Sequence, residues 1–266
     1  IFNLNNFLDV NNLAPLLTVA GTIFAYFSIL IISFGDFSRY VKNEQELKKG
    51  NLSLILNLII FSFLSVFIVI GSDVFLNQKF SDIDRIFTNP TDIVGKFDNI
   101  QITIVVLFFI IIASASTNLV ANFIPSQYSL INFAPSILSL KSASYLIAFF
   151  GLLIAIFWLT ILSQIGILSF VDTFGAFFGP LFGVMAADYY LIKNQELSNK
   201  DLYSIDKESA YYYSGGWHIK GVYSLIIGFI FSASTIWNTN LMFLQSYAWI
   251  IGAFVAWITY YLLAKK

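Results

Sequence analysis

Seven long apolar runs constrain the fold of this chain more than any other feature of its sequence. Each run is close to the length of about 20 residues that an α-helix needs to cross the hydrocarbon core of a bilayer. The run at 54–70 is almost continuously apolar, whereas strands of a membrane β-barrel alternate apolar and polar residues. The sequence therefore predicts an all-α, polytopic transmembrane bundle that forms a single membrane domain over residues 1–266. The predicted helices span roughly 14–35, 52–77, 101–124, 143–163, 167–192, 220–238 and 240–263.

The composition fits a surface that meets lipid rather than water. Hydrophobic residues make up 58% of the chain and charged residues 11%, whereas a soluble domain has about 45–50% and about 25%. A net charge of −1 argues against nucleic acid as a partner, because phosphates require a basic face. The chain has no cysteine and one histidine, His218, which leaves no disulfide, no thiolate site and no histidine cluster.

Basic residues in the loops predict the orientation of the helices. Eleven of the 14 Lys and Arg residues fall in alternate loops and at the C-terminus, and three fall in the other loops. The positive-inside rule places the larger group, and so the C-terminus, in the cytoplasm. The N-terminus of the chain is then outside, in a cell-membrane protein. Nothing in residues 1–13 explains such an export, so we expect an odd number of helices to precede the chain. The alternative is a true seven-helix protein with an outside N-terminus.

Polar side chains at membrane depth are costly and mark candidate functional sites. The third run contains Ser114, Ser116, Thr117, Asn118 and Asn122. Hydroxyl and carbonyl oxygens suit a small hard cation, and the amide of Asn122 offers a donor and an acceptor to an amide-like or heterocyclic ligand. The alternative is helix packing, in which small residues allow close approach and Ser or Thr bonds back to its own helix. The Ser/Thr residues leave both interpretations open, and Asn122 favours a site because its bulk does not help close packing.

The fifth run carries a stripe of small residues. Gly175, Gly179 and Gly183 recur every four residues, which is typical of close helix contacts in membranes. Pro180 removes a backbone hydrogen bond and kinks helices. A kinked, glycine-lined helix suits a moving gate, with Gly179, Pro180 and Gly183 as the gate candidates. Tight static packing is the alternative.

Charged and aromatic residues near the helix ends are expected to lie at the membrane surface. Asp172 and Asp188 flank the glycine stripe and are expected to stay hydrated. Asp36 and Arg39 are three residues apart, so we expect a structural ion pair at a helix end. Trp249, like most of the aromatic residues, is expected to face lipid or the interface.

Three stretches of the chain resemble the nucleobase:cation symporter-1 family, which includes permeases for cytosine, uracil, purines, allantoin and hydantoins. The stretches are Asp36–Tyr40, Ser116–Asn122 and Gly179–Leu191, and they follow the order and spacing of the family's helices six, eight and ten. The resemblance covers almost the whole chain. It implies family helices six to twelve, with five upstream helices missing. It also implies the second five-helix repeat of a LeuT-type inverted-repeat transporter, followed by two C-terminal helices.

The resemblance also implies the residues of a site. Asn122 matches the family's substrate-binding asparagine. The family often has a stacking tryptophan on helix six, where this chain has Phe27 with Tyr26 beside it, a departure that keeps an aromatic ring available for stacking. The family's eighth-helix sodium ligands match the backbone carbonyl of Ala113 and the oxygens of Ser116 and Thr117.

These observations together predict a secondary active transporter and not an enzyme, because no nucleophile–base pair, phosphate loop or metal cluster occurs in the apolar runs. The expected activity is uptake of a nucleobase, or of a related planar compound such as allantoin or hydantoin, coupled to Na⁺ or H⁺ and without a cofactor. Its partners are the substrate, the coupling cation, the lipid bilayer and the missing N-terminal helices. One alternative is a channel, although no ring of like charge and no carbonyl-filter motif is visible. The other is a non-transport structural membrane protein.

Overall fold

The computed structural model describes residues 10–79, 90–96, 99–158, 167–202, 204 and 206–265. Most of these residues are helical, and the β structure among them is an isolated bridge between Ser214 and Trp217. Two π-helical segments and one 3₁₀ segment join or extend the α-helices: η1 (Leu119–Phe123), η3 (Asp188–Ile192) and η4 (Thr239–Tyr247). The α-helices are α2 (Val10–Ile32), α3 (Phe34–Ser38), α4 (Glu44–Lys79), α5 (Pro90–Val94), α6 (Ile100–Asn118), α7 (Ile124–Phe133), α8 (Leu140–Phe157), α10 (Ile167–Ala187), α11 (Asn199–Leu202), α12 (Ile219–Trp237) and α13 (Ala248–Ala264).

Seven helical stretches of the described chain are long and apolar enough to cross a membrane. The predicted all-α, polytopic membrane bundle is therefore confirmed, while the exact limits of its spans stay predictions, and residues 159–163 of the fourth predicted run lie outside the described residues. The stretches are Pro15–Ile32, Glu44–Phe75, Ile100–Phe133, Leu140–Phe157, Val171–Ile192, Ile219–Trp237 and Thr239–Ala264.

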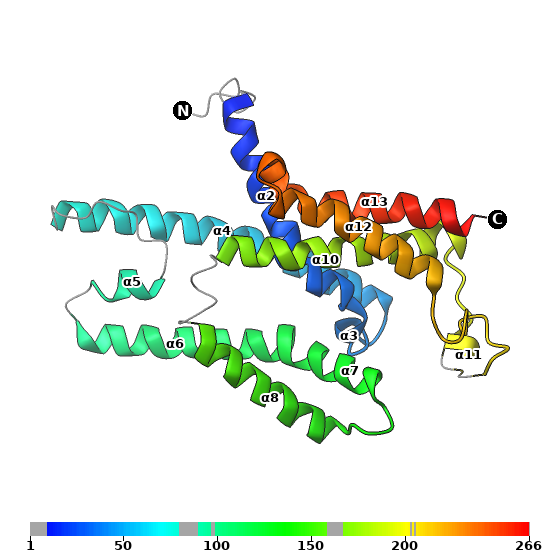
Figure 1. The fold of residues 1–266 in the computed structure, drawn as a ribbon. Helices are drawn as coiled ribbons and strands as arrows, with labels where there is room; N and C mark the ends of the chain where they lie inside the picture. Colours follow the sequence, from blue (N-terminus) through cyan, green and yellow to red (C-terminus); the bar gives the residue numbers. More distant parts are fainter. Residues whose placement is uncertain are drawn as a thin grey trace. The chain divides into compact units, whose positions relative to one another are not determined.

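The chain forms two compact units, which we describe separately. The packed unit comprises residues 1–34 and 149–266, and the exposed unit comprises residues 35–148. In the packed unit, α12 and α13 run along α10, and α2 packs on α10 as well (Figure 1). The prediction of a single membrane domain stays a prediction.

Small residues bring the helices of the packed unit into backbone contact. A Cβ atom on Gly179 would overlap the carbonyl oxygen of Trp249 on α13, and one on Gly183 would overlap that of Ala253. In the same α10–α13 contact, a Cβ on Gly252 would lie 2.8 Å from Cδ of Pro180. Membrane helices associate through such close van der Waals contact, because lipid supplies no hydrophobic driving force between helices.

This packing corrects the expected position of Trp249. Its side chain is buried, with 6% exposure, rather than turned to the interface. The indole ring lies between Phe24 of α2, at 5.6 Å between ring centroids, and Phe182 of α10, at 5.3 Å. The glycine stripe of α10 leaves room for the α13 backbone, and the first turn of α13 therefore carries its tryptophan into the core.

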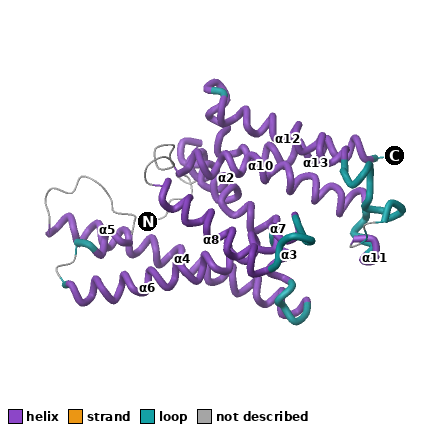
Figure 2. Tube along the Cα trace, turned by 60° about the horizontal axis from the view of Figure 1, so that its bottom comes forward, coloured by secondary structure: helices purple, strands orange, loops and turns teal. Residues whose placement is uncertain are grey.

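The exposed unit consists of long helices with few contacts to one another. None of the described residues of α6, and none in the most apolar 18-residue stretch of α4, is buried within the chain. α6 begins with an N-cap. The Asn99 side chain accepts hydrogen bonds from the backbone N–H groups of Gln101 and Ile102, at 3.1 Å each. α7 is followed by a turn that leads into α8 (Figure 2).

Two contacts tie the turn that follows α3 to α7 within this unit, and Arg39 takes part in one of them. Arg39 donates to Asp36 at 2.8 Å, which confirms the expected ion pair. The guanidinium of Arg39 lies 4.3 Å above the Tyr128 ring, and the hydroxyl groups of Tyr40 and Tyr128 form a hydrogen bond.

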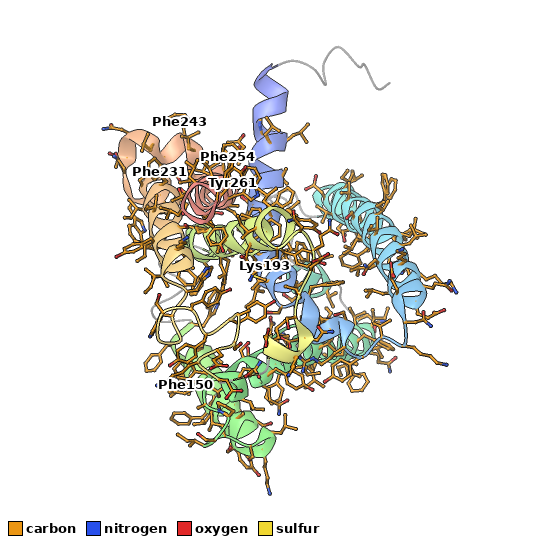
Figure 3. All side chains as sticks on the ribbon, turned by 90° about the vertical axis from the view of Figure 1, so that its right-hand side faces the viewer. Phe150, Lys193, Phe231, Phe243, Phe254 and Tyr261 are labelled. Carbon is orange, nitrogen blue, oxygen red and sulfur yellow. The ribbon has the colours of Figure 1, made fainter. Side chains whose placement is uncertain are left out.

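Large aromatic side chains point away from the helix contacts of the packed unit. Phe231 on α12 is 55% exposed, Phe243 on η4 is 75% exposed and Phe254 on α13 is 60% exposed (Figure 3). Such side chains suit contact with lipid, and they agree with the prediction that most aromatic residues of this chain face outward.

Candidate functional site

The polar segment of α6 and η1 forms a ladder of side-chain hydrogen bonds along one stretch of helix. Ser116 Oγ donates to the carbonyl oxygen of Ala113 at 2.9 Å. Asn118 Nδ2 donates to the carbonyl oxygen of Ser114 at 3.0 Å, and Asn122 Nδ2 donates to Asn118 Oδ1 at 2.6 Å. All of these residues, Thr117 and Asn122 included, are exposed within the exposed unit.

Two of the three predicted sodium ligands are neighbours in this ladder. The 2.9 Å bond places the Ala113 carbonyl and the Ser116 hydroxyl side by side, and both are the hard oxygen atoms that small cations prefer. Thr117 follows directly in sequence, on the same turn of α6. The sodium assignment stays a prediction.

The predicted substrate residue, Asn122, lies inside a π-helical segment. Ile124 N–H donates to the Leu119 carbonyl, five residues back, instead of four. The cause lies at Pro125, the second residue of α7, which has no N–H to donate and whose ring crowds the carbonyl four residues earlier. Single π-helical turns of this kind are frequent at functional sites. Asn122 uses one Nδ2 hydrogen in its bond to Asn118, and its Oδ1 atom can accept a hydrogen bond from a ligand N–H.

The predicted aromatic residues, Tyr26 and Phe27, lie on α2 in the packed unit. Their rings meet edge to face, with centroids 5.2 Å apart, and Tyr26 is 65% exposed. Tyr26 lines a cavity of about 260 Å³ between α2 and α10, opposite Phe174 and Phe178. Tyr26 therefore borders a cavity with an aromatic wall, and Phe27 does not line it. These residues belong to a different unit from Asn122, so each half of the predicted site is described by itself.

The gate candidates of α10 lie where it packs on α13. Pro180 is fully buried against Gly252 and Gly228, and Gly179 and Gly183 meet the α13 backbone. This is the packing interpretation of the glycine stripe, and a gating role for the same residues stays a prediction. The sequence analysis did not identify the helices that pack on this stripe. A signal was present, because small residues also recur every four residues on α12, at Gly228 and Ser232.

Asp172 differs from its expected position. It is 3% exposed instead of hydrated. Its Oδ2 atom accepts a hydrogen bond from Gln245 Nε2 of η4 at 3.0 Å, and its Oδ1 atom is buried without a partner. The sequence showed an acidic residue close to a helix end. It did not show that Gln245, in the 3₁₀ segment η4, forms a hydrogen bond with this residue.

Asp188, at the other end of α10, belongs to a cluster with α13 and the start of α12. Tyr260 donates to Asp188 Oδ1 at 2.6 Å, and His218 Nε2 lies 3.3 Å from the Tyr260 hydroxyl. The Tyr213 ring stacks on His218 with centroids 4.0 Å apart. Burial lowers the pKa of His218 and raises the pKa of Tyr213. A cavity of about 220 Å³ adjoins this cluster, with Lys193 at its edge.

The described part of the chain has seven membrane-length helical stretches, one of which carries a polar ladder and a π-helical turn, and this defines a multi-pass membrane protein with a candidate binding segment. The chain belongs to the nucleobase:cation symporter-1 family, because residues 4–261 match the family model described as "Permease for cytosine/purines, uracil, thiamine, allantoin". This confirms the family predicted from the three sequence stretches.

Curated relatives include two bacterial proteins and one plant protein. An "Allantoin permease" of Bacillus subtilis (strain 168) is 27% identical over 91% of this chain and 48% of its own length. A "Purine-uracil permease NCS1" of Arabidopsis thaliana is 25% identical over 91% of the chain and 41% of its own length. A "Putative allantoin permease" of Escherichia coli (strain K12) is 26% identical over 94% and 50%. The chain thus spans about half the length of these relatives. No solved structure matches it.

Proposed function

We propose that the chain is the C-terminal part of a secondary active transporter, corresponding to helices six to twelve of a LeuT-type fold. The complete transporter takes up a nucleobase, or a related planar compound such as allantoin or hydantoin, together with Na⁺ or H⁺. Its permease relatives support this proposal, since their names refer to allantoin, purines and uracil. The binding energy of the cation favours one conformation, and alternating access converts the ion gradient into uptake.

The observation that carries the proposal is the position of Asn122 on the π-helical turn after the Ala113–Ser116 oxygen pair. Irregular backbone at membrane depth is tolerated where it lines a cavity or is covered by protein. In this arrangement the Oδ1 atom of Asn122 accepts a hydrogen bond from the ring N–H of the substrate. The oxygen pair, together with Thr117, supplies part of a cation shell one to two turns away.

Substitutions in the complete transporter test the two roles separately. If Thr117 supplies a cation ligand, Thr117→Ala weakens cation binding directly and substrate binding only through coupling. Coupling energies typically change affinity by about 5–150-fold, and high Na⁺ should restore it. If Asn122 contacts the substrate, Asn122→Ala weakens substrate binding by about 1–3 kcal/mol, and high Na⁺ should not fully restore it. Substrate affinity is measured by binding at increasing Na⁺ concentrations.

Matched controls lie in the same unit. Thr103→Ala changes a threonine of the same helix α6, and Asn57→Ala removes an asparagine on α4 whose side chain donates to the Ser53 carbonyl at 2.8 Å. Both controls should keep wild-type affinities. Unchanged substrate and cation affinities in Thr117→Ala and Asn122→Ala would show that the site assignment is wrong even though the family is right.

Further measurements address the mode of transport and the orientation. Counterflow of labelled substrate separates a carrier from a channel, and uptake by the 266-residue chain alone in liposomes should be absent if half of the site lies on other helices. Because the chain has no cysteine, Lys48→Cys and Lys200→Cys should react with a membrane-impermeant reagent only after the membrane is opened, and Lys96→Cys should react from outside. The reverse pattern would overturn the proposed cytoplasmic C-terminus.

A further inference from the structure

Asp172 carries a buried carboxyl group, and one of its two oxygen atoms has no hydrogen-bond partner. The residue lies near the start of α10 and is 3% exposed. Gln245 Nε2, on η4, donates to Oδ2 at 3.0 Å, and Oδ1 is enclosed by the chain without any hydrogen-bond partner. Buried polar atoms are almost always hydrogen-bonded, so an orphaned carboxyl oxygen in the middle of a helix contact calls for an explanation.

No charged residue of the surrounding helices is placed to pair with this carboxyl group. Within their described bounds, α2, η4 and α13 contain no Lys, Arg, His, Asp or Glu, and Asp172 is the only such residue of α10. The single charged residue of α12 is Lys220, in its first turn. The opposite half of α12 is the part that reaches this region, because Ser232 Oγ donates to the Ala176 carbonyl at 2.6 Å, one turn after Asp172.

The remaining titratable residues on these elements are tyrosines, which are neutral at physiological pH because their ordinary pKa is about 10. An ionised Asp172 in the packed unit would therefore be a buried charge whose one partner is a neutral amide. Buried charges without a counter-ion are avoided in proteins, and the group takes up a proton instead. The tyrosines are Tyr26 on α2, Tyr223 on α12, Tyr247 on η4, and Tyr260 and Tyr261 on α13.

We propose that Asp172 is a proton-binding site, in which Oδ1 carries the proton while Oδ2 accepts the hydrogen bond from Gln245. The proton neutralises the carboxyl group as long as Gln245 of η4 stays hydrogen-bonded to Asp172 of α10 as it is here. When α10 moves away from η4 and the group meets water, the proton is released. Proton binding therefore favours the packed arrangement, and pH shifts the balance between the two conformations. This inference rests on the proposed transport function.

A sodium ion fits this position less well than a proton. Hard cations require several oxygen ligands around them. Here an N–H donor already faces Oδ2, which leaves Oδ1 as the one open oxygen of the pair. A proton needs only that single atom. The predicted sodium ligands lie elsewhere, on α6, so the two ions would not compete for the same group.

The test is initial substrate uptake by the complete transporter in liposomes between about pH 5 and about pH 8, at constant Na⁺. Wild-type uptake should change with pH by up to about tenfold per pH unit, as expected for one proton. Asp172→Asn keeps the shape of the protonated side chain and should make uptake independent of pH, within about twofold. Asp206→Asn, in the loop before α12, is the control and should retain the wild-type profile.

A second variant separates proton binding from a folding defect. Gln245→Glu places another carboxyl group beside Asp172, and two carboxyl groups in contact retain a shared proton to higher pH. The pH profile should then move to higher pH in a protein that still transports. A wild-type profile in either Asp172→Asn or Gln245→Glu overturns the proposal, and so does a loss of Na⁺ dependence with the pH dependence intact, which would indicate a sodium site.

The proposal and the transport function can fail separately. If wild-type protein carries no nucleobase, allantoin or hydantoin, the proposed function fails, and the proton site is then tested on thermal unfolding of the purified protein. Wild-type protein should lose thermal stability as pH rises over the same range, because the buried carboxyl group is forced to ionise. Asp172→Asn should lose less. Equal losses in the two proteins overturn the proton site without reference to transport.

Discussion

The two units of the chain both contain helices long enough to cross a membrane, but they differ in what those helices contact. In the packed unit, 39% of the residues in the most apolar 18-residue stretch of α10 and of α12 are buried, whereas in the exposed unit the corresponding stretches of α4 and α6 have 0% buried. The difference follows from residue size. Small residues recur every four positions on α10, α12 and α13, whereas the central part of α4, residues 54–70, is mainly large aliphatic and aromatic. Close packing between membrane helices requires small residues.

The polar side chains of the two units differ in the same way. In the packed unit, three polar side chains bond between elements: Ser232 to Ala176, Gln245 to Asp172 and Tyr260 to Asp188. In the exposed unit the serines and asparagines of α6 and η1 bond to their own stretch of helix. The first set is therefore committed to holding helices together, and the second set remains accessible for a ligand or for other helices.

The largest expected effect comes from filling the α10–α13 contact. In Gly183→Val, the new Cβ overlaps the carbonyl oxygen of Ala253, a backbone atom that moves only with α13. Overpacking usually costs about 1–3 kcal/mol, and we expect the upper end of that range or more. Thermal unfolding in detergent, followed by tryptophan fluorescence, measures the loss.

The matched control for this substitution is Gly71→Val on α4, where an added Cβ meets nothing within 4 Å. We expect a change within about 0.5 kcal/mol, as for most exposed positions. Similar destabilisation by both valines would show that α4 is packed as tightly as α10, and the contrast between the two units would not hold.

The next largest effect is expected at the Asp188 cluster. Tyr260→Phe removes the hydroxyl group that donates to Asp188 at 2.6 Å and leaves that acceptor unpaired. The expected cost is about 1–3 kcal/mol, measured by the same unfolding experiment. Tyr261→Phe, the neighbouring residue, keeps its ring on Trp257 and should cost much less. Equal effects would indicate that the hydrogen bond adds nothing to the packing of the ring.

The membrane class and the family could be predicted from the sequence because both depend on local patterns. Apolar run length sets the number of helices, and the stretch around Asn122 carried the family resemblance. The predicted exposure of Asp172 and of Trp249 was wrong, because the burial of these two side chains depends on elements that are distant in the sequence. Gln245 and Gly179 are 73 and 70 positions away from their respective partners, as numbered in the sequence. No local pattern indicates that Gln245 of η4 bonds to Asp172 of α10.

A pair of serines probes the same contrast at a smaller scale. Ser232 is fully buried, and its hydroxyl group donates across the helix contact to the Ala176 carbonyl at 2.6 Å. Ser116 donates to Ala113 within its own helix and is exposed. Ser232→Ala should destabilise the protein by about 0.6–1.7 kcal/mol, the range of polar contacts between membrane helices. Ser116→Ala should have almost no effect on unfolding. A larger loss for Ser116→Ala would mean that α6 depends on this bond for its fold.

The smallest expected effect is a pH dependence confined to the packed unit, which holds the single histidine of the chain, His218. Burial lowers its pKa, the nearby Lys193 and Lys220 act in the same direction, and Asp188 opposes them. The folded state therefore binds the proton less readily than the unfolded chain, whose histidine has a pKa of about 6.5.

The His218 contribution to stability is complete above about pH 6.5 and is lost as the pH falls through the lower pKa of the folded state. His218→Gln should remove this loss, so the difference in unfolding temperature between wild type and variant should shrink or reverse between about pH 7 and about pH 5. Taking the difference cancels any titration of Asp172, which both proteins share. The shift should be smaller than that of Ser232→Ala, because His218 is only half-buried. A difference that stays constant over this range would show that the stacked His218 ring titrates as it does in the unfolded chain.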